Sequence, residues 1–333
     1  MPDEEDVRDA APDADEELAE GEALLAEGDL DEALMRAARA VAVAPERSDV
    51  VAFANKAIAA HRDPLAVLKL ARGAPFGVVA LRARALAYRQ RWMDAAEVTF
   101  DVAAFRPSLA YLSWVPPWLA QIEESMSPAD ADRLVGFVVH FVNAAVGGDP
   151  SDAGLHRNFV AASSILAVIE PRSSRKSRVA IVRAFLLRRL GRAREAVPIA
   201  EGAYATEPSW ATAVELANTY RDAGRLEEAV TFFRLATDLD RSDCTAWLDL
   251  ADVLLSMARD VEAEAAYAHV LEAEPRHPVA GPSRLYVALR RGDPTALDAL
   301  RAMAAQSGEA GNLARGLLAR VGVLHCRDQG RGA

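Results

Sequence analysis

The chain has 333 residues, 51% hydrophobic but only 6% aromatic, and is rich in Ala, Leu, Arg and Glu, which predicts an all-α protein too long for one ordinary core. Its net charge of −11 conceals an asymmetry, because residues 1–32 hold fifteen acidic residues and one basic residue, so the remainder is weakly basic. No secretory signal, membrane-spanning run or paired-cysteine motif is recognisable, so we expect a cytoplasmic protein whose two cysteines are reduced.

The N-terminal part is predicted to comprise an acidic disordered tail, residues 1–13, and a helical stack, residues 14–109. Two similar motifs recur in the stack, GDLDEA from residue 28 and the looser QRWMDA from residue 90. A proline stands twelve residues beyond the final alanine of both motifs. This arrangement predicts helices that are joined in pairs by short turns.

Residues 110–172 lose this register, and we interpret them as an irregular helical joint between two stacks. Paired prolines interrupt the chain, and Ser127 with Asp130 then predicts the start of another helix. Three aromatic residues of the joint suit either a ligand cage or a buried core, and we favour the core because large aromatics usually fill irregular joints: Tyr111, Trp114 and Trp118.

Residues 173–325 are predicted to form a second stack that ends in a capping helix from Ala310 to His325. Three motifs repeat in it, GRAREA, GRLEEA and ARDVEA. Their final alanines are spaced by 33 and 34 residues, at Ala196, Ala229 and Ala263. Residues 326–333 are predicted to be a disordered tail.

This period, with a small residue in the first helix, an alanine and a large residue in the second and a closing proline, resembles the tetratricopeptide repeat. The best unit runs from Trp210 to Asp243. The resemblance implies an α-solenoid of stacked helix-turn-helix repeats, here in two stacks with an irregular helical joint, whose first helices line a concave groove. The same pattern has a physical reading, because Ala229 permits a close helix crossing and Gly224 permits a left-handed turn.

Signals for catalysis are weak in this sequence. An HRD triplet from His61 lacks the rest of a kinase signature, and DPSDAG from Asp149 lacks the closing glutamate of a calcium loop. His325 beside Cys326 has no further ligand at a suitable spacing. We therefore expect no enzyme activity, no metal and no cofactor.

The resemblance implies a non-enzymatic scaffold or adaptor that binds a peptide or protein partner in its groove; a structural or regulatory subunit of a larger assembly is the alternative. Val214 replaces the lysine expected in a chaperone-tail carboxylate clamp, so co-chaperone activity is not expected. Groove-facing positions of the second stack are the predicted partner-binding residues: Arg178, Phe185, Arg188, Arg189, Asn218, Arg221, Asp252 and Tyr286.

The nature of the partner is predicted only in outline. Residues 172–194 hold nine basic residues and no acidic one, which suits an acidic protein or peptide. We expect neither a membrane nor a nucleic acid as partner, because basic helices are often simply solvated and the whole chain is acidic. A homo-oligomer is an alternative that the sequence leaves open.

Overall fold

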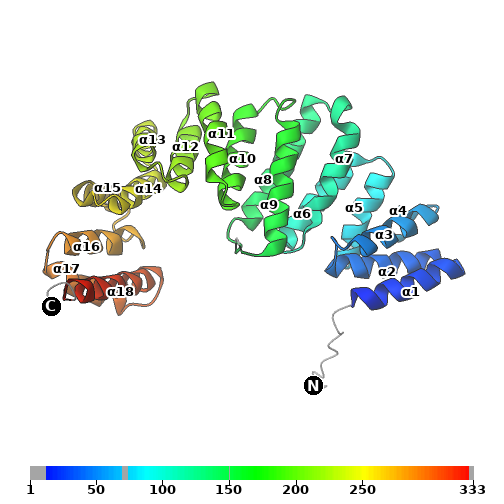
Figure 1. Ribbon diagram of the computed structural model, residues 1–333, viewed down its shortest axis with the longest axis horizontal. Helices are drawn as coiled ribbons and strands as arrows, with labels where there is room; N and C mark the ends of the chain where they lie inside the picture. Colours follow the sequence, from blue (N-terminus) through cyan, green and yellow to red (C-terminus); the bar gives the residue numbers. More distant parts are fainter. Residues whose placement is uncertain (1–12, 70–73, 150, 330–333) are drawn as a thin grey trace, which may run out of the picture. The chain divides into compact units, whose positions relative to one another are not determined.

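A computed structural model describes residues 13–69, 74–149 and 151–329, with the backbone alone for residues 321–329. All regular structure in these residues is helical, which confirms the predicted all-α class (Figure 1). The chain divides after Arg192 into two compact units, which we call unit 1, residues 1–192, and unit 2, residues 193–333. The predicted disordered segment 1–13 lies outside the described residues except for Asp13, which caps the first helix.

Unit 1 begins with paired helices and continues into longer, less regular ones. Its described elements are α1 (Ala14–Glu27), α2 (Leu30–Val43), α3 (Ser48–Ala60), α4 (Pro64–Val67), α5 (Phe76–Tyr88), α6 (Trp92–Phe105), the 3-10 helix η1 (Tyr111–Trp114), α7 (Val115–Ile122), the 3-10 helix η2 (Glu123–Ser125), α8 (Pro128–Ala145), α9 (Ala153–Ile169) and α10 (Lys176–Arg189).

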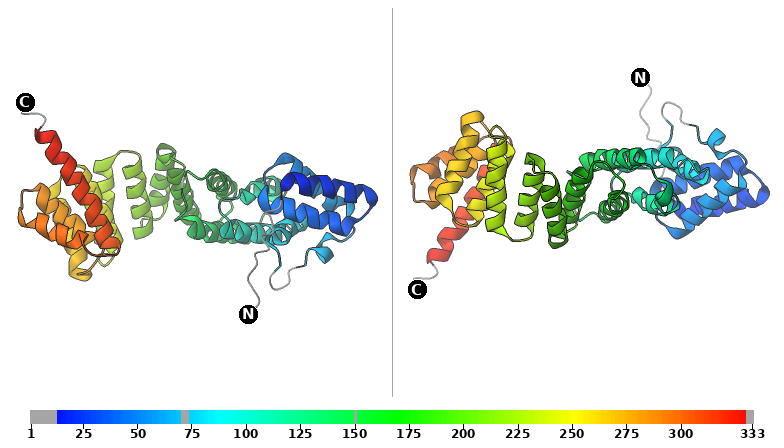
Figure 2. Two further views of the ribbon diagram at one scale, coloured as in Figure 1. Left: turned by 90° about the horizontal axis from the view of Figure 1, so that it is seen from below. Right: turned by 90° about the horizontal axis from the view of Figure 1, so that it is seen from above.

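Unit 2 is a succession of antiparallel helix pairs, which the further views in Figure 2 show from two sides. Its described elements are α11 (Ala193–Thr206), α12 (Trp210–Asp222), α13 (Leu226–Leu239), α14 (Cys244–Ser256), α15 (Asp260–Ala273), α16 (Ala280–Arg290), α17 (Thr295–Ala304) and α18 (Glu309–Gln329). Since α18 continues to Gln329, the predicted disorder of residues 326–333 is wrong for 326–329, and residues 330–333 lie outside the described part.

The turns between paired helices confirm the repeat register read from the sequence. The first residue of each of the five motifs has a positive φ, a conformation that costs little for glycine and about 1–2 kcal/mol for other residues. Three of these positions are glycine, and the other two are Gln90 (φ 59°) and Ala258 (φ 58°). The same turn is therefore kept even where its sequence is unfavourable.

Small residues lie where the helices of unit 2 cross. Ala217 on α12, Ala229 and Ala236 on α13 are fully buried, and Phe233 fills the space beside them. Alanine at a crossing permits the close approach that two packed helices need. The predicted role of Ala229 at the contact of α12 with α13 agrees with its burial.

Unit 1 departs from this pattern because α4 has only four residues. In its place α5 packs directly against α2, as well as against α3 and α6. The contact with α2 depends on Gly77, where a Cβ atom would lie 2.0 Å from the carbonyl oxygen of Ala38. This close crossing fixes the position of α5, on which the site described below depends.

Hydrogen bonds from side chains to backbone tie the joint to the first repeats. The Tyr111 hydroxyl donates to the Val41 carbonyl oxygen at 3.1 Å, and the Trp114 indole donates to the Pro45 oxygen at 2.8 Å. Both rings are buried, which confirms the interpretation of these two residues as core, and burial raises the pKa of Tyr111. On α9, the buried Asn158 amide donates to two carbonyl oxygens ahead of η1.

The turn between α9 and α10 is held by one carboxylate of α8. Asp132 accepts hydrogen bonds from the hydroxyls of Ser173 (2.7 Å) and Ser174 (2.5 Å) and from the Ser174 amide (3.0 Å). These hydrogen bonds hold the pKa of Asp132 below its usual value. Asp132 therefore fixes the turn in its ionised form.

Candidate functional site

The eight predicted partner-binding residues fall in both units. Arg178, Phe185, Arg188 and Arg189 lie on α10 in unit 1. The other four lie in unit 2, on α12, α14 and α16: Asn218, Arg221, Asp252 and Tyr286.

On α10, the basic side chains differ in their surroundings. Arg189 is hydrogen-bonded within unit 1, where it donates to the carbonyl oxygens of Val146 (3.2 Å) and Gly148 (3.1 Å). The Arg188 guanidinium lies 5.7 Å from the centre of the Phe185 ring. Arg178 is exposed. The role of these four residues in partner binding stays a prediction.

In unit 2, the predicted residues have partners within the chain. Arg221 pairs with Asp249 at 2.9 Å, and Asn218 donates to the Val214 carbonyl oxygen at 3.1 Å. Asp252 accepts a hydrogen bond from the Tyr267 hydroxyl. Burial is the largest cause of the raised pKa of Tyr267, and the neighbouring Asp252 adds to it. Asp252 and the buried Tyr286 also line a pocket of about 490 Å³ between α14, α15, α16 and α18. Their role in partner binding likewise stays a prediction.

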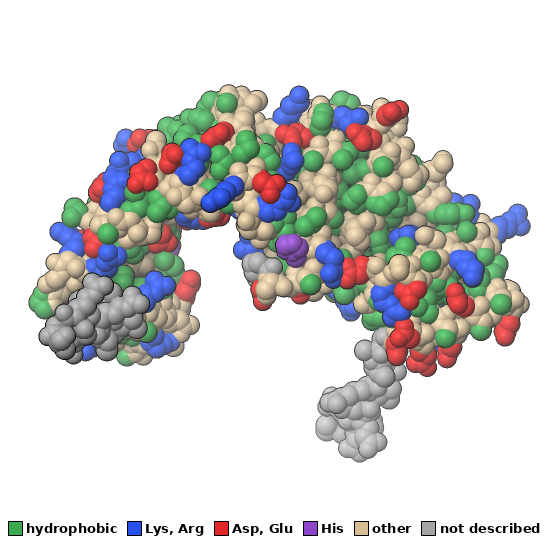
Figure 3. Space-filling view, in the orientation of Figure 1, with side chains coloured by type: hydrophobic (Ala, Val, Ile, Leu, Met, Phe, Trp, Pro, Cys, Tyr) green, Lys and Arg blue, Asp and Glu red, His purple; other side chains and the backbone are tan. Residues whose placement is uncertain are grey.

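A larger pocket of about 620 Å³, which we call the Arg84 pocket, opens in unit 1 between α3, α5 and α7. Its lining holds two cations, four amide or aromatic hydrogen-bonding residues, two tryptophans and no carboxylate: Asn55, Lys56, Ala59, Arg84, Ala87, Tyr88, Gln90, Trp92, Pro117, Trp118 and Gln121. The lining is therefore positive, whereas acidic side chains gather over the α1 end of the unit (Figure 3).

Arg84 is the central charge of this pocket. Its Nε donates to Asn55 Oδ1 at 2.6 Å, and its guanidinium lies 5.0 Å from the centre of the Trp114 ring. No carboxylate pairs with it among the described residues. Burial without such a partner lowers the pKa of Arg84 to about 10. An anion that entered the pocket would relieve this unfavourable desolvation.

The rest of the pocket offers both charge and apolar surface. The Lys56 side chain is 65% exposed and reaches only to 4.0 Å from Glu22, so its amine is available to a ligand. Tyr88 is 55% exposed, an unusual exposure for so large a ring, while Trp118 is buried and forms part of the wall. Trp118 belongs to the same buried core as Tyr111 and Trp114, which confirms its interpretation as a core residue, and it also lines the pocket.

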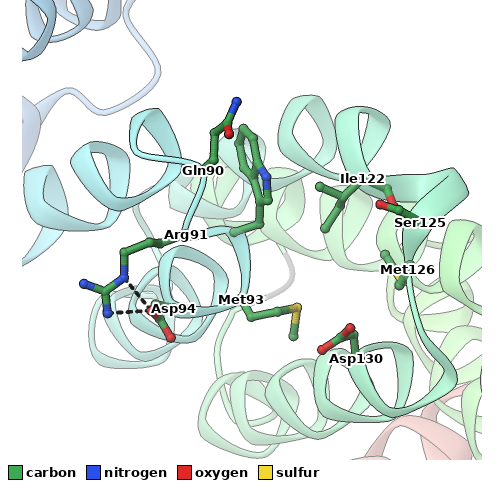
Figure 4. A pocket seen from close by; sticks show the side chains of 9 residues that line it. Gln90, Arg91, Met93, Asp94, Ile122, Ser125, Met126 and Asp130 are labelled. Carbon is green, nitrogen blue, oxygen red and sulfur yellow. Dashed lines mark hydrogen bonds and ion pairs between the residues drawn. The ribbon is translucent and has the colours of Figure 1, made fainter.

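A second, smaller pocket of about 330 Å³ adjoins the first, and we call it the methionine pocket. It is lined by Met93, Met126, Ile122 and Trp92, with polar residues at its edge. Figure 4 shows the Met93 side chain reaching toward the side where Met126 and Asp130 lie. Two of its residues, Gln90 and Trp92, also line the Arg84 pocket, so the two pockets are neighbours.

None of the residues that line the Arg84 pocket is among the predicted partner-binding residues, although the sequence contains a signal for them. Asn218 stands eight residues after the start of α12, and Asp252 stands eight after the start of α14. Counting in the same way from Ser48 and Phe76, which begin α3 and α5, gives Lys56 and Arg84. Applying the groove-facing position to both stacks would have found them.

Neither a metal-ligand cluster nor a membrane-spanning helix is found in the described part of the chain. It contains no group of three or more metal-ligating side chains. None of its helices has the length and apolar character that crossing a membrane requires.

Comparison with known proteins finds a family match for one helix pair of unit 2. Residues 212–243, which cover most of α12 and α13, match the model of the tetratricopeptide repeat. No curated protein sequence matches the chain significantly.

Several solved structures are similar. MamA 41-end from Desulfovibrio magneticus RS-1 is 15% identical, with 44% of this chain and 88% of that chain covered and a TM-score of 0.34. YrrB, described as a TPR protein with an unusual peptide-binding site, is 13% identical over 56% and 96%, with a TM-score of 0.35. The APC/C hetero-tetramer Cut9-Hcn1 is 13% identical over 94% and 57%, with a TM-score of 0.43.

The matched segment and the repeated helix pairs with their positive-φ turns define the class: an all-α protein built from stacked helix-turn-helix repeats. The α12–α13 pair is similar to a tetratricopeptide repeat, in agreement with the resemblance seen in the sequence.

Proposed function

We propose that the chain is a non-enzymatic interaction scaffold that binds an acidic peptide or protein partner at the Arg84 pocket of unit 1. The observation that carries this proposal is Arg84 itself, a half-buried guanidinium that lines the pocket and has no carboxylate partner among the described residues. Partial desolvation of a cation without a counter-ion is unfavourable for the free protein, and such a cost is typical of a binding site. Exposed Tyr88 beside it supplies the aromatic surface that interfaces favour.

The proposal differs from the sequence prediction in where the partner binds. In unit 2 the arginine and the carboxylate at the predicted positions, Arg221 and Asp252, already have partners in the chain. A ligand would have to displace those contacts. Among the described residues, Arg84 has no carboxylate partner, and Lys56 has only a weak contact with Glu22 at 4.0 Å. Unit 1 is therefore the better binding surface.

Site-specific photocrosslinking in cells tests this function. A photoreactive phenylalanine analogue replaces Tyr88 in one variant and Val261 in a control, since both side chains are apolar and more than half exposed. The proposal predicts a discrete protein adduct at Tyr88 and none at Val261. The absence of an adduct at Tyr88, or equal labelling at both positions, would contradict it.

A further inference from the structure

The two neighbouring pockets of unit 1 differ in charge. The Arg84 pocket has two cations and no carboxylate in its lining. The methionine pocket has two carboxylates, but both are engaged: Asp94 pairs with Arg91 at 2.6 Å, and Asp130 accepts a hydrogen bond from Ser127 at 2.7 Å. An anionic group therefore prefers the Arg84 side, and an uncharged group prefers the methionine side.

The methionine pocket has the lining expected for one apolar side chain. Met93, Ile122 and Trp92 are only half-buried, and Met126 is nearly buried, so apolar surface stays open at its mouth. Methionine side chains are flexible and polarisable, which permits them to pack around aliphatic or aromatic groups of different shape. A volume of about 330 Å³ suits one large side chain and is too small for a folded domain.

The boundary between the pockets is a single short stretch of chain. Gln90 and Trp92 line both, at the turn that leads from α5 into α6. A segment that places one side chain on each side of this turn occupies both pockets at once. Residues close together in an extended peptide meet this requirement, since each residue spans only about 3.3 Å.

We propose that the two pockets form one bipartite site for a partner peptide in which an acidic residue stands close to a large apolar residue. The carboxylate contacts Arg84 and Lys56, and the apolar side chain enters between Met93 and Met126. The inference deepens the proposed function and depends on it, because it states which chemistry the Arg84 pocket selects. The acidic residue supplies the counter-ion, and the apolar residue supplies buried area.

Selection from a library of random short peptides displayed on phage tests the specificity, with the full chain as bait. The wild-type chain is expected to enrich peptides that carry Asp or Glu near Leu, Met or Phe. Arg84→Gln should lose the preference for the acidic residue, and Met93→Gln should lose the preference for the apolar one while keeping the other. Arg133→Gln, at a half-exposed cation of α8 outside both pockets, should select as wild type does.

Affinities for one labelled probe containing Glu-Glu-Leu complete the test. Arg84→Gln should weaken binding by about tenfold or more, because it removes a charge-assisted hydrogen bond to the carboxylate. A probe with Gln-Gln-Leu should bind wild type as weakly as the acidic probe binds the variant. Should Arg84→Gln unfold the chain, Lys56→Gln at an exposed side chain is expected to weaken the acidic probe selectively.

The outcomes separate this inference from the proposed function. Selected peptides without an acidic bias, or an unchanged affinity of Arg84→Gln, would overturn the inference. If Tyr88 still crosslinks a protein in that case, the scaffold function stands and the recognition chemistry is different. If Tyr88 yields no adduct either, both proposals fail.

Discussion

The α12–α15 repeats of unit 2 and the α3–α7 region of unit 1 place polar residues at the same position of the repeat but surround them differently. In unit 2, Asn218 and Asp252 bond to their own unit. In unit 1, the equivalent Lys56 and Arg84 face a pocket that lacks carboxylates. The two regions also differ in packing, because α4 is only one turn long and α5 packs directly against α2. Regular stacking satisfies these positions internally, and its interruption leaves them open.

The largest expected effect concerns the close crossing that makes unit 1 irregular. Gly77→Ala would place a methyl group 2.0 Å from the Ala38 oxygen, which is backbone and cannot give way cheaply. We expect a loss of about 3 kcal/mol or more in the free energy of unfolding. Gly136→Ala on α8 is the control, because no atom lies near its added Cβ and alanine should stabilise that helix by about 0.5–1 kcal/mol. Denaturant titration measures both, and equal effects would contradict the crossing.

The corresponding test in unit 2 is Ala229→Trp. This fully buried alanine lies at the contact of α12 with α13, so an indole overpacks the crossing. The expected loss is about 1–3 kcal/mol or more. Thermal unfolding followed by circular dichroism measures it, and an unchanged Tm would show that the regular repeat does not depend on a small residue there.

A smaller effect compares two turns of equal geometry. Ala258 and Gly224 both have positive φ, 58° and 80°, but only glycine adopts this conformation without strain. Ala258→Gly should therefore stabilise the protein and Gly224→Ala should destabilise it, each by about 1 kcal/mol. Chemical denaturation of both variants decides the point, since changes of the same sign would mean that the two turns are not equivalent.

The smallest expected effect is on thermal stability at acid pH, and it concerns the turn between α9 and α10 of unit 1. The pKa of Asp132 is lowered by hydrogen bonds from Ser173 and Ser174, so it stabilises the folded state above its unfolded pKa. This stabilisation should be lost as the pH falls through the lower, folded-state pKa. Asp132→Asn should therefore reduce the Tm at neutral pH and leave it nearly unchanged at strongly acid pH. Asp238→Asn, at an exposed position of α13, is the control, and a matching pH profile for both variants would contradict this account.

The sequence predicts the repeats well because each turn depends on local chemistry. The motif that begins at Gly224 ends one helix and starts the next within a few residues, and the same register identifies the strained turns at Gln90 and Ala258. Local patterns also indicate the N-caps of α8 and α9, at Ser127 and Asp152.

The binding surface is harder to predict because it depends on contacts between distant segments. Nothing near Arg221 in the sequence shows that Asp249 pairs with it, and nothing near Arg84 shows that its closest polar partner is the neutral Asn55. The consequences of the short α4 are equally distant, since they appear in the packing of α5 on α2. Repeat position identifies which side chains face outward, and packing decides whether they are already paired.

Within unit 1, partner binding is proposed at Arg84 and not at the basic helix α10. The most direct measurement is the affinity of the partner crosslinked at Tyr88 for three full-length chains: wild type, Arg84→Gln and Arg178→Gln. Both variants remove one positive charge, so the comparison is matched in net charge. The account predicts a weakening of about tenfold or more for Arg84→Gln and less than about twofold for Arg178→Gln. The reverse order would contradict it and assign binding to the basic helix predicted from the sequence.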